Sequence, residues 1–558
     1  MIRRLIGCAA LAMATTAQAE TTKPTLLVVI SVDQLSADLF AEYRAHFTGG
    51  LKRLSQGVVF PSGYQSHSAT ETCPGHSTIL TGARPARNGI VANNWMDLST
   101  ARTDKVIYCA EDESVAGSTS KKYTVSAVHL KVPTLGERMN AADPRVRIVS
   151  VAGKDRAAVM MGGHRVDQLW YWTGKSFEGS AIGTPAVAVA RTNAAVTTEI
   201  ARAASPLPLS PLCALRNRAI SVGSATIGTS RFDRRAGDTR AFRASPAMDG
   251  ATIKLAGDIA DELKLGRGPQ TDVLIVGASG TDFIGHAYGT GGGEMCLQLQ
   301  ALDAQIGTLF KRLDSAKIDY VVALTADHGG HDAPERNREL AIPDSMRVDA
   351  TLMPDAMGKA LAAEMGIAAP LLYGTDPAGD IYVDKAITGA TRDTVITRAK
   401  AAYLARPQVA AVFTAADIAA TPPATTTPES WTLAERVKAG YVPGRSGDLI
   451  VLLKARVTPI AAAVPGYAAT HGSPWDYDRR VPVLFWRKGM AGFEQPNSIE
   501  TVDIAPTLAA LIGFPIPTDE MDGKCRDLIA GPASSCPPER QWYIGLDGKP
   551  TPARPRLR

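Results

Sequence analysis

The sequence predicts an α/β fold in which helices cover a mostly parallel sheet. The main observation is a set of short apolar runs without polar alternation, as in strands buried on both faces. Segments with helical character lie between or after them, at 253–265, 297–313 and 504–512, and we expect Asp503 to cap the last. Strands that alternate with helices are typical of parallel sheets. The apolar runs are 25–32, 147–151, 272–276 and 320–325.

Residues that can carry chemistry follow all four apolar runs. Parallel strands end at one edge of a sheet, and ligands bind outside that edge. One polar residue after a strand is usually a turn or cap residue, but four such sets should meet at one place. They are Asp33, then Lys154 with Arg156, then Asp282, and finally Asp327 with His328.

The N-terminus reads as an export signal. In residues 1–19, Arg3 and Arg4 precede an apolar stretch, and residues 17–19 are a small-residue cleavage site. The protein should therefore be periplasmic or secreted after cleavage near Ala19. A lipoprotein cleavage box at Cys8 is the alternative, but only three apolar residues precede this cysteine.

The remainder is expected to be one domain. Residues 20–540 should form a single catalytic domain with insertions at about 166–244 and 347–430 that cap the sheet, and 541–558 should be a C-terminal tail. No later segment resembles a membrane helix, so no membrane anchor is expected. The formal net charge of +5 in 558 residues does not favour nucleic-acid binding. We expect a monomer.

The cysteines predict disulfides. Six remain after residue 19, an even number that indicates disulfides in an exported protein. Cys525 and Cys536 are close in sequence and make the best pair. Cys73–Cys109 with Cys213–Cys296 is one way to pair the others, and the sequence leaves other pairings open.

Three aspartates and three histidines have the character of metal ligands. Asp282 and His286 are four residues apart, so a helix would place both on one face. The others lie at strand ends or in a glycine-rich loop, and they are Asp33, Asp327, His328 and His471. Oxygen and nitrogen donors without thiolates suit zinc. Two sets of three ligands predict two zinc ions, each with a position left for substrate or water.

Thr72 is the candidate nucleophile. We expect a helix to start just after it, beyond Pro74, where backbone amides and the helix dipole favour an anion. Metal coordination would activate its hydroxyl. The alternative is that Thr72 only caps the helix. His76 and the remaining histidines have no setting comparable to that of the predicted ligands.

Seven motifs together resemble the alkaline phosphatase superfamily. More narrowly, they are similar to bacterial PafA-type phosphatases with a threonine nucleophile, which are related to nucleotide pyrophosphatase/phosphodiesterases. The resemblance implies a three-layer sandwich of the alkaline phosphatase type, with a mostly parallel central sheet and inserted cap or crown segments. The motifs occur in the family's order, at 31–34, 72–76, 93–95, 153–156, 281–286, 326–329 and 470–474.

The resemblance also implies a role for each site residue. Asn93 would donate to a phosphoryl oxygen, with Asn94 as the alternative. Lys154 and Arg156 would contact the phosphoryl oxygens, and because the diesterase relatives lack this pair, it favours phosphomonoesters. The implied zinc ligands are Asp282, His286 and His471 for one ion, and Asp33, Asp327, His328 and Thr72 for the other.

The function implied is an exported alkaline phosphatase that hydrolyses small-molecule phosphomonoesters through a phosphothreonine. A phosphodiesterase or nucleotide pyrophosphatase is the main alternative, and a non-catalytic zinc- or phosphate-binding protein is the second. A sulfatase is excluded, because its Cys-x-Pro-x-Arg motif is absent and Pro74 directly follows Cys73.

Overall fold

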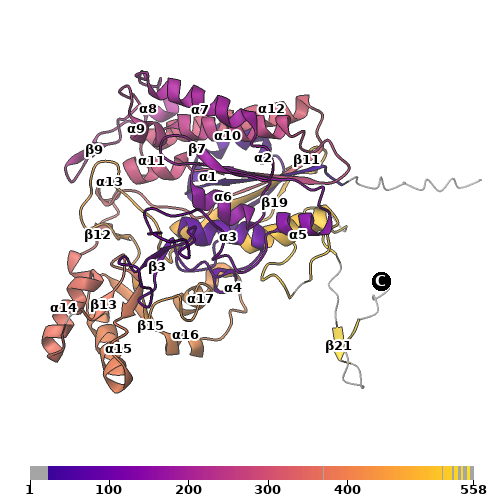
Figure 1. The fold of residues 1–558 in the computed structure, drawn as a ribbon. Helices are drawn as coiled ribbons and strands as arrows, with labels where there is room; N and C mark the ends of the chain where they lie inside the picture. The colour runs from indigo at the N-terminus through magenta and orange to yellow at the C-terminus, as the bar shows by residue number, and fades with distance from the viewer. Residues whose placement is uncertain are drawn as a thin grey trace, which may run out of the picture.

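The computed structural model describes residues 23–368, 370–517, 519–530, 533–537, 542–544 and 550–552. Its centre is a ten-stranded sheet in the order β19-β2-β18-β11-β1-β10-β5-β6-β7, with β20 paired to β2 (Figure 1). The four predicted strands are neighbours in its middle and run parallel, which confirms the mostly parallel sheet. They are β5 (Ile148–Ala152), β10 (Asp272–Ala278), β1 (Leu26–Val32) and β11 (Tyr320–Thr325).

One antiparallel strand interrupts the sheet on the β11 side. β18 (Arg480–Arg487) runs antiparallel both to β11 and to β2 (Val58–Tyr64). Two reversals restore the direction, so β2 runs the same way as β1. The end of β2 therefore points to the same edge as the ends of the four central strands. The short strands β19 (Phe493–Glu494) and β20 (Ile499–Glu500) both pair with β2.

Residues 166–244 do not lie only above the sheet, as a cap would. β6 (Gln168–Trp172) pairs parallel with β5, and β7 (Phe177–Ala181) pairs antiparallel with β6, so both strands lengthen the central sheet. Helix α7 (Val187–Ile200) then packs on α10 (Pro246–Glu262). In β6 buried and partly exposed residues alternate, as in a strand with one face less covered than the other. A search for continuous apolar runs misses such a strand.

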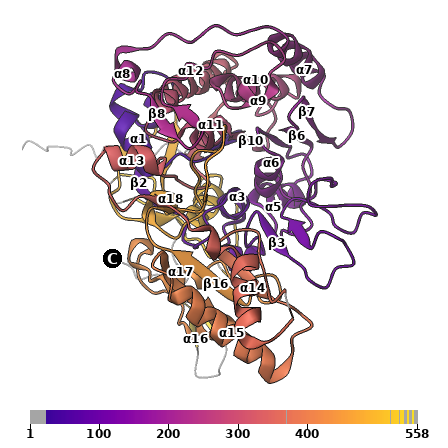
Figure 2. The same cartoon turned by 90° about the vertical axis from the view of Figure 1, so that its left-hand side faces the viewer.

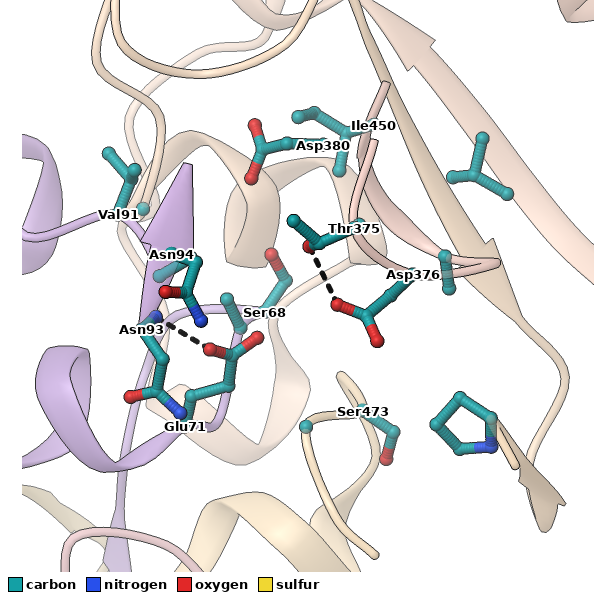
Figure 3. Close-up of a pocket in the computed structure, with 18 of the residues that line it drawn as sticks. Ser68, Glu71, Val91, Asn93, Asn94, Thr375, Asp376, Asp380, Ile450 and Ser473 are labelled. Atoms are coloured by element: carbon teal, nitrogen blue, oxygen red, sulfur yellow. Dashed lines mark hydrogen bonds between the residues drawn. The ribbon is translucent and has the colours of Figure 1, made fainter. Parts of the chain in front are cut away.

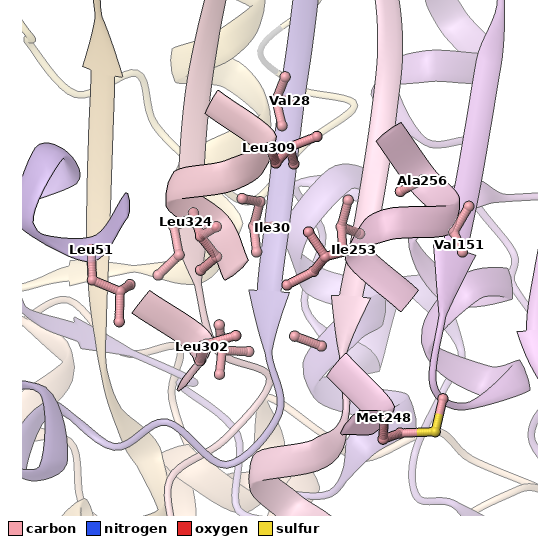
Figure 4. Packing of buried hydrophobic residues seen from close by; sticks show 14 of the residues in the cluster. Val28, Ile30, Leu51, Val151, Met248, Ile253, Ala256, Leu302, Leu309 and Leu324 are labelled. Carbon is pink, nitrogen blue, oxygen red and sulfur yellow. The ribbon is translucent and has the colours of Figure 1, made fainter. Parts of the chain in front are cut away.

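Helices cover both faces of the sheet, which explains the uninterrupted apolar run of β1. Its alternate residues enter two different cores: Val28 and Ile30 pack on one face, and Leu27 and Val29 on the other. On the first face Val28 and Ile30 lie near side chains of α10 and α12 (Gly293–Ser315) (Figure 4). The second face is covered by α3 (Thr72–Thr81), α5 (Leu135–Ala142) and α19 (Ile504–Leu511).

The three predicted helices are present as α10, α12 and α19, but Asp503 does not cap α19 as expected. Its carboxylate accepts hydrogen bonds from the backbone N–H groups of Glu500 and Lys524 and pairs with Arg526. No side-chain cap bond occurs at the start of α19. Asp503 instead ties a distant loop to the helix, which its neighbours in sequence cannot reveal.

A second, smaller sheet forms most of the lobe at the bottom of Figures 1 and 2. Its order is β13-β14-β16-β15, and it includes β14 (Gly379–Val383) and β16 (Leu449–Leu453). Helices α14 (Pro354–Met365) and α15 (Gly389–Leu404) pack against it around a separate apolar core. The predicted insertion at 347–430 supplies most of this lobe, but β16 lies beyond its end.

All three disulfides considered from the sequence occur: Cys73–Cys109, Cys213–Cys296 and Cys525–Cys536. The predicted signal peptide lies outside the described residues. Of the predicted tail, only β21 (Trp542–Ile544) and β22 (Pro550–Pro552) are described, as an antiparallel pair. Among the described helices, none combines the length and the hydropathy that a bilayer span requires.

Candidate active site and metal centre

The strand ends bring the predicted site residues to one edge of the central sheet. Asp33 directly follows β1, and its N–H donates to Ala278 at the end of β10, at 3.0 Å. Asp327 follows β11 by two residues. Lys154 follows β5 and starts helix α6 (Asp155–Gly162), while Asp282 lies in the first turn of α11 (Gly280–Tyr288). The parallel arrangement is therefore what gathers these side chains.

Lys154 lies between the two predicted ligand sets. Its Nζ is 2.5 Å from Oδ2 of Asp282 and 3.0 Å from Oδ2 of Asp33. The same ammonium is 3.5 Å from Oγ1 of Thr72. The side chain is only 3% exposed, so these contacts take place away from bulk solvent. One buried cation thus links both acid groups to the candidate nucleophile.

Thr72 is the first residue of α3, so the helix begins earlier than expected and already includes Pro74. Thr72 itself is fully buried. Its hydroxyl makes no capping bond, and the residue before it, Glu71, occupies the cap position without a side-chain bond to the helix. The capping alternative for Thr72 is therefore not what the structure shows. Its position still places the hydroxyl where the first helical amides favour an anion.

Asn93 is held rigidly beside Thr72. Its Oδ1 accepts the N–H of Cys73 at 2.8 Å, and its own N–H donates to Oε2 of Glu71 at 2.6 Å (Figure 3). The carboxamide oxygen is thereby occupied, and its NH2 group has no hydrogen-bond partner among the described residues. Asn93 can therefore offer two N–H donors to a ligand. Asn94, the alternative, is the first residue of β3 (Asn94–Met96). Both asparagines line one cavity beside the site.

The first predicted ligand set comes together around one oxygen atom. Oδ1 of Asp282 is 3.4 Å from Nε2 of His286 and 3.3 Å from Nε2 of His471. The helical spacing predicted for Asp282 and His286 is present in α11. His471 arrives from a loop far along the chain and stacks on His328 with ring centroids 3.5 Å apart. Because of this stacking, the two predicted sets are in direct contact.

The second set gains a residue that the sequence analysis missed. Nε2 of His328 is 3.1 Å from Oδ2 of Asp327, as a shared site requires. His76 also belongs here: Nε2 is 3.3 Å from Oδ1 of Asp33, and Nδ1 is 3.3 Å from Oδ2 of Asp327. The usable signal was its spacing of four residues from Thr72, which puts both on one face of α3.

These four histidines share one orientation. Each Nδ1 lies 2.8–2.9 Å from a backbone carbonyl oxygen, which fixes the ring and turns Nε2 toward a carboxylate. An Nδ1–H that donates to the carbonyl leaves a lone pair on Nε2. Nε2 and the carboxylate oxygen opposite it are then both acceptors. Only a proton or a metal ion between them makes that contact favourable. The carbonyls belong to Thr72 (facing His76), Ala469 (His286), Gly329 (His328) and Thr70 (His471).

Buried atoms without partners also fit a metal centre. Oδ1 of Asp33, Oδ1 of Asp282, Oδ2 of Asp327 and Nε2 of His328 are buried, and none has a hydrogen-bond partner among the described residues. Such atoms are costly unless a ligand satisfies them. The ligand atoms fall into two compact groups, each within 4.8 Å: Asp282 with His328 and His471, and Asp33 with His76 and Asp327. The site can therefore hold metal ions in two places.

Electrostatics keep the first set ready to bind a cation. Burial lowers the pKa of His471 to about 3, and burial also lowers the pKa of His286. Both rings are thus neutral at pH 7 and have a lone pair. Burial would raise the pKa of Asp282, but His286, Lys154 and His471 outweigh it and hold the pKa well below the usual range. A carboxylate with two neutral imidazoles is a suitable donor set for zinc.

Arg156 lies in the first turn of α6, close to Lys154. Its Nη1 is 3.4 Å from the hydroxyl of Tyr108, and its Nε is buried with no hydrogen-bond partner in the part of the chain that the structure describes. Although burial lowers its pKa, the neighbouring Tyr108 and Asp155 raise it above the normal value, so Arg156 remains charged. Its guanidinium lines the cavity next to Asn93.

A cavity of about 360 Å³ opens between the site and the small sheet. Arg156, His286, His471 and Asn93 line it on the catalytic side. Residues of β14 and β16 line it opposite, including Asp380 and Ile450 (Figure 3). This volume is sufficient for a small organic group beside the metal ligands.

Comparisons with known proteins agree with this arrangement. Residues 27–474 match the family described as type I phosphodiesterase / nucleotide pyrophosphatase. Alkaline phosphatase PhoK from Sphingomonas sp. is 54% identical over 522 residues, which cover 92% of this chain and 93% of the relative. Alkaline phosphatase PhoD from Zymomonas mobilis is 48% identical over 517 residues, covering 92% and 89%.

The fold has a counterpart among solved structures. The crystal structure of alkaline phosphatase PafA superposes with a TM-score of 0.78 at 23% identity, covering 91% of this chain and 99% of that one. The resemblance predicted from the seven motifs is thus confirmed. The chain belongs to the type I phosphodiesterase / nucleotide pyrophosphatase family and, within it, to the alkaline phosphatases.

Proposed function

We propose that the protein hydrolyses phosphomonoesters to an alcohol and inorganic phosphate, with Thr72 as nucleophile at a site for two zinc ions. One observation carries the proposal: Nζ of Lys154 lies 3.5 Å from Oγ1 of Thr72, and Arg156 follows two residues later in the first turn of α6. A monoester brings three terminal oxygens and about two negative charges, and two cations beside the nucleophile suit that group. A diester carries one charge less and needs room for a second organic group.

The ligand sets that we propose are those predicted from the sequence. They assign His328 to the ion at Asp327, 3.1 Å away, although His328 also lies within reach of Asp282 and His471. Asp282, His286 and His471 would hold one zinc ion, and Asp33, Asp327, His328 and Thr72 the other. His76 would position Asp33 and Asp327 from the nucleophile's own helix. Bound zinc lowers the pKa of a coordinated hydroxyl and neutralises charge that develops on the oxygens of the reacting phosphate.

The protein side chains then have distinct tasks. Oγ1 of Thr72 loses its proton to solvent and forms a bond to phosphorus, while the bond from phosphorus to the ester oxygen breaks. The departing alkoxide takes a proton from solvent and leaves as the alcohol. Water cleaves the phosphothreonine, which restores the hydroxyl and releases phosphate. The NH2 group of Asn93, the ammonium of Lys154 and the guanidinium of Arg156 bind the phosphoryl oxygens throughout. Their fixed positions stabilise the charge of the transition state.

Export is part of the proposal. It is supported by the charged and apolar leader in residues 1–19 and by three disulfides, which form in oxidising compartments. N-terminal sequencing of the protein recovered from outside the cytoplasm should begin at Glu20. An intact Met1 on the exported protein would contradict cleavage near Ala19.

The test of the activity compares 4-nitrophenyl phosphate with bis(4-nitrophenyl) phosphate on the zinc-loaded enzyme. We expect kcat/KM to favour the monoester by at least about 100-fold, since an interaction made only with the doubly charged group is lost in the diester. A diester preference would instead support the second candidate, a phosphodiesterase, which the family match favours.

A further inference from the structure

We propose that a basic groove beside the catalytic site binds a second anionic group on the substrate, so that phosphomonoesters with a carboxylate or further phosphate in their alcohol part are preferred. The proposal rests on the phosphomonoesterase function above. The groove has a volume of about 320 Å³ and is lined by Arg240 and Arg243 together with Lys154 and Arg156. His286 and Asp282 of the candidate metal centre also line it. It therefore opens directly onto the place where the phosphoryl group would bind.

Helix α9 (Thr239–Arg243) places the two outer arginines, and it lies beside α11 in both views of the molecule (Figures 1 and 2). The guanidinium of Arg243 lies 4.6 Å from the ring centre of Phe283, which stands next to Asp282 in α11. Nζ of Lys154 lies 5.1 Å from the centre of the same ring. One aromatic ring thus positions a groove cation and a catalytic cation relative to each other.

No acid among the described residues neutralises the two outer arginines, although Arg243 stacks on Phe283. Neither Arg240 nor Arg243 forms an ion pair or a side-chain hydrogen bond with any described residue, and both are exposed. Among the described residues that line the groove, the one acid is Asp282, which already contacts Lys154, His286 and His471. Two guanidiniums side by side repel each other, so an anion between them would lower the free energy of the site.

The cavity on the other side of the site has the opposite charge. Three acids, Glu71, Asp376 and Asp380, line it against one arginine, Arg156, and Figure 3 shows the three acids around the same space. An anionic alcohol part would be repelled from that cavity and attracted to the groove. The charges on the two sides therefore give the substrate an orientation, with its distal anion over Arg240 and Arg243.

The test uses two substrates that differ in one group. 3-Phosphoglycerate carries a carboxylate where glycerol 3-phosphate carries a hydroxymethyl group. We expect the ratio of their kcat/KM values to fall about threefold to fivefold in Arg240→Gln or Arg243→Gln and about tenfold in the double variant, mainly through KM for the anionic substrate. Arg191→Gln removes an exposed arginine from α7 and should leave the ratio unchanged.

One lysine variant and a change in salt concentration test the role of charge. Arg243→Lys keeps the charge and should restore most of the ratio, and added salt should lower the ratio of the wild type more than that of the double variant. An unchanged ratio in the double variant would overturn the proposal. So would a change confined to inhibition by inorganic phosphate, which would make the groove a product site. Turnover of glycerol 3-phosphate by the wild type distinguishes these results from a failure of the proposed function. If the protein were not a phosphomonoesterase, the wild type would not hydrolyse this substrate.

Discussion

Nζ of Lys154 lies 3.5 Å from Oγ1 of Thr72, within a site where both side chains are almost completely removed from solvent. The same ammonium touches one carboxylate of each proposed ligand set. One side chain thus contacts the proposed nucleophile and both proposed groups of metal ligands.

Lys154→Gln should lower kcat/KM for 4-nitrophenyl phosphate by about 100-fold, because the variant lacks the positive charge that meets the doubly charged phosphoryl group. Turnover of bis(4-nitrophenyl) phosphate should fall less, so the monoester preference shrinks. Metal content must be measured on the same sample, since Lys154 also contacts Asp33 and Asp282. Equal losses on both substrates with full metal content would show that Lys154 does not discriminate between them.

Thr72→Ala should lower kcat by on the order of 1,000-fold or more, because no hydroxyl remains to form the covalent intermediate. Thr72→Ser keeps a hydroxyl and should retain far more activity. Acid quenching during turnover of a labelled monoester, followed by peptide mapping, should find phosphate on residue 72 in the wild type. Unchanged turnover by Thr72→Ala would exclude Thr72 as the nucleophile.

Removal of metal by a chelator should abolish turnover and lower Tm, because bound ions stabilise only the folded state. Zinc should restore both properties. Recovery by magnesium alone would contradict the zinc assignment, since magnesium prefers octahedral oxygen ligands and retains water.

Two variants should distinguish a direct metal ligand from a residue that only positions ligands in the second set. Asp327→Asn is expected to lose one zinc ion, whereas His76→Asn should retain both but bind one of them about 10- to 100-fold more weakly, as for a residue that orients a ligand. Metal analysis at graded zinc concentrations measures the difference. A complete loss of one ion in His76→Asn would make His76 a direct ligand.

Asp380 should make stability fall as pH rises. Burial raises its pKa from the usual value of 3.8 to about 6, although the N–H of Gly447 donates to it. Between these values the folded state binds more protons than the unfolded state, so the free energy of unfolding decreases as pH increases. Asp380→Asn should therefore stabilise the protein by about 1 kcal/mol more at pH 8 than at pH 5, after allowance for partial exposure.

Urea unfolding of the zinc-loaded protein at the two pH values measures this effect. Asp393→Asn, an exposed position on α15, serves as the control and should show no comparable difference. If Asp380→Asn destabilised the protein equally at both values, the hydrogen bond to Gly447 and not the charge would dominate.

The sequence alone predicted the strands that define the site, for a physical reason. Strands buried on both faces must be apolar throughout, so β1, β5, β10 and β11 can be recognised in the sequence as apolar runs. The polar residues at their ends stand out because they end these runs. The parallel order then fixes where those residues go. Strand β6 was missed because it is partly exposed and alternates.

The candidate reactive residues and their local spacing can be recognised in the sequence: Thr72, the pair Asp282 and His286, and the pair Lys154 and Arg156. Which of these groups meet depends on how the chain packs. The tertiary structure placed His76 against Asp33, His471 on His328, and Arg243 over Phe283. Such contacts join segments far apart in the chain, and they depend on how helices and loops pack on the sheet, which no local pattern of residue types records.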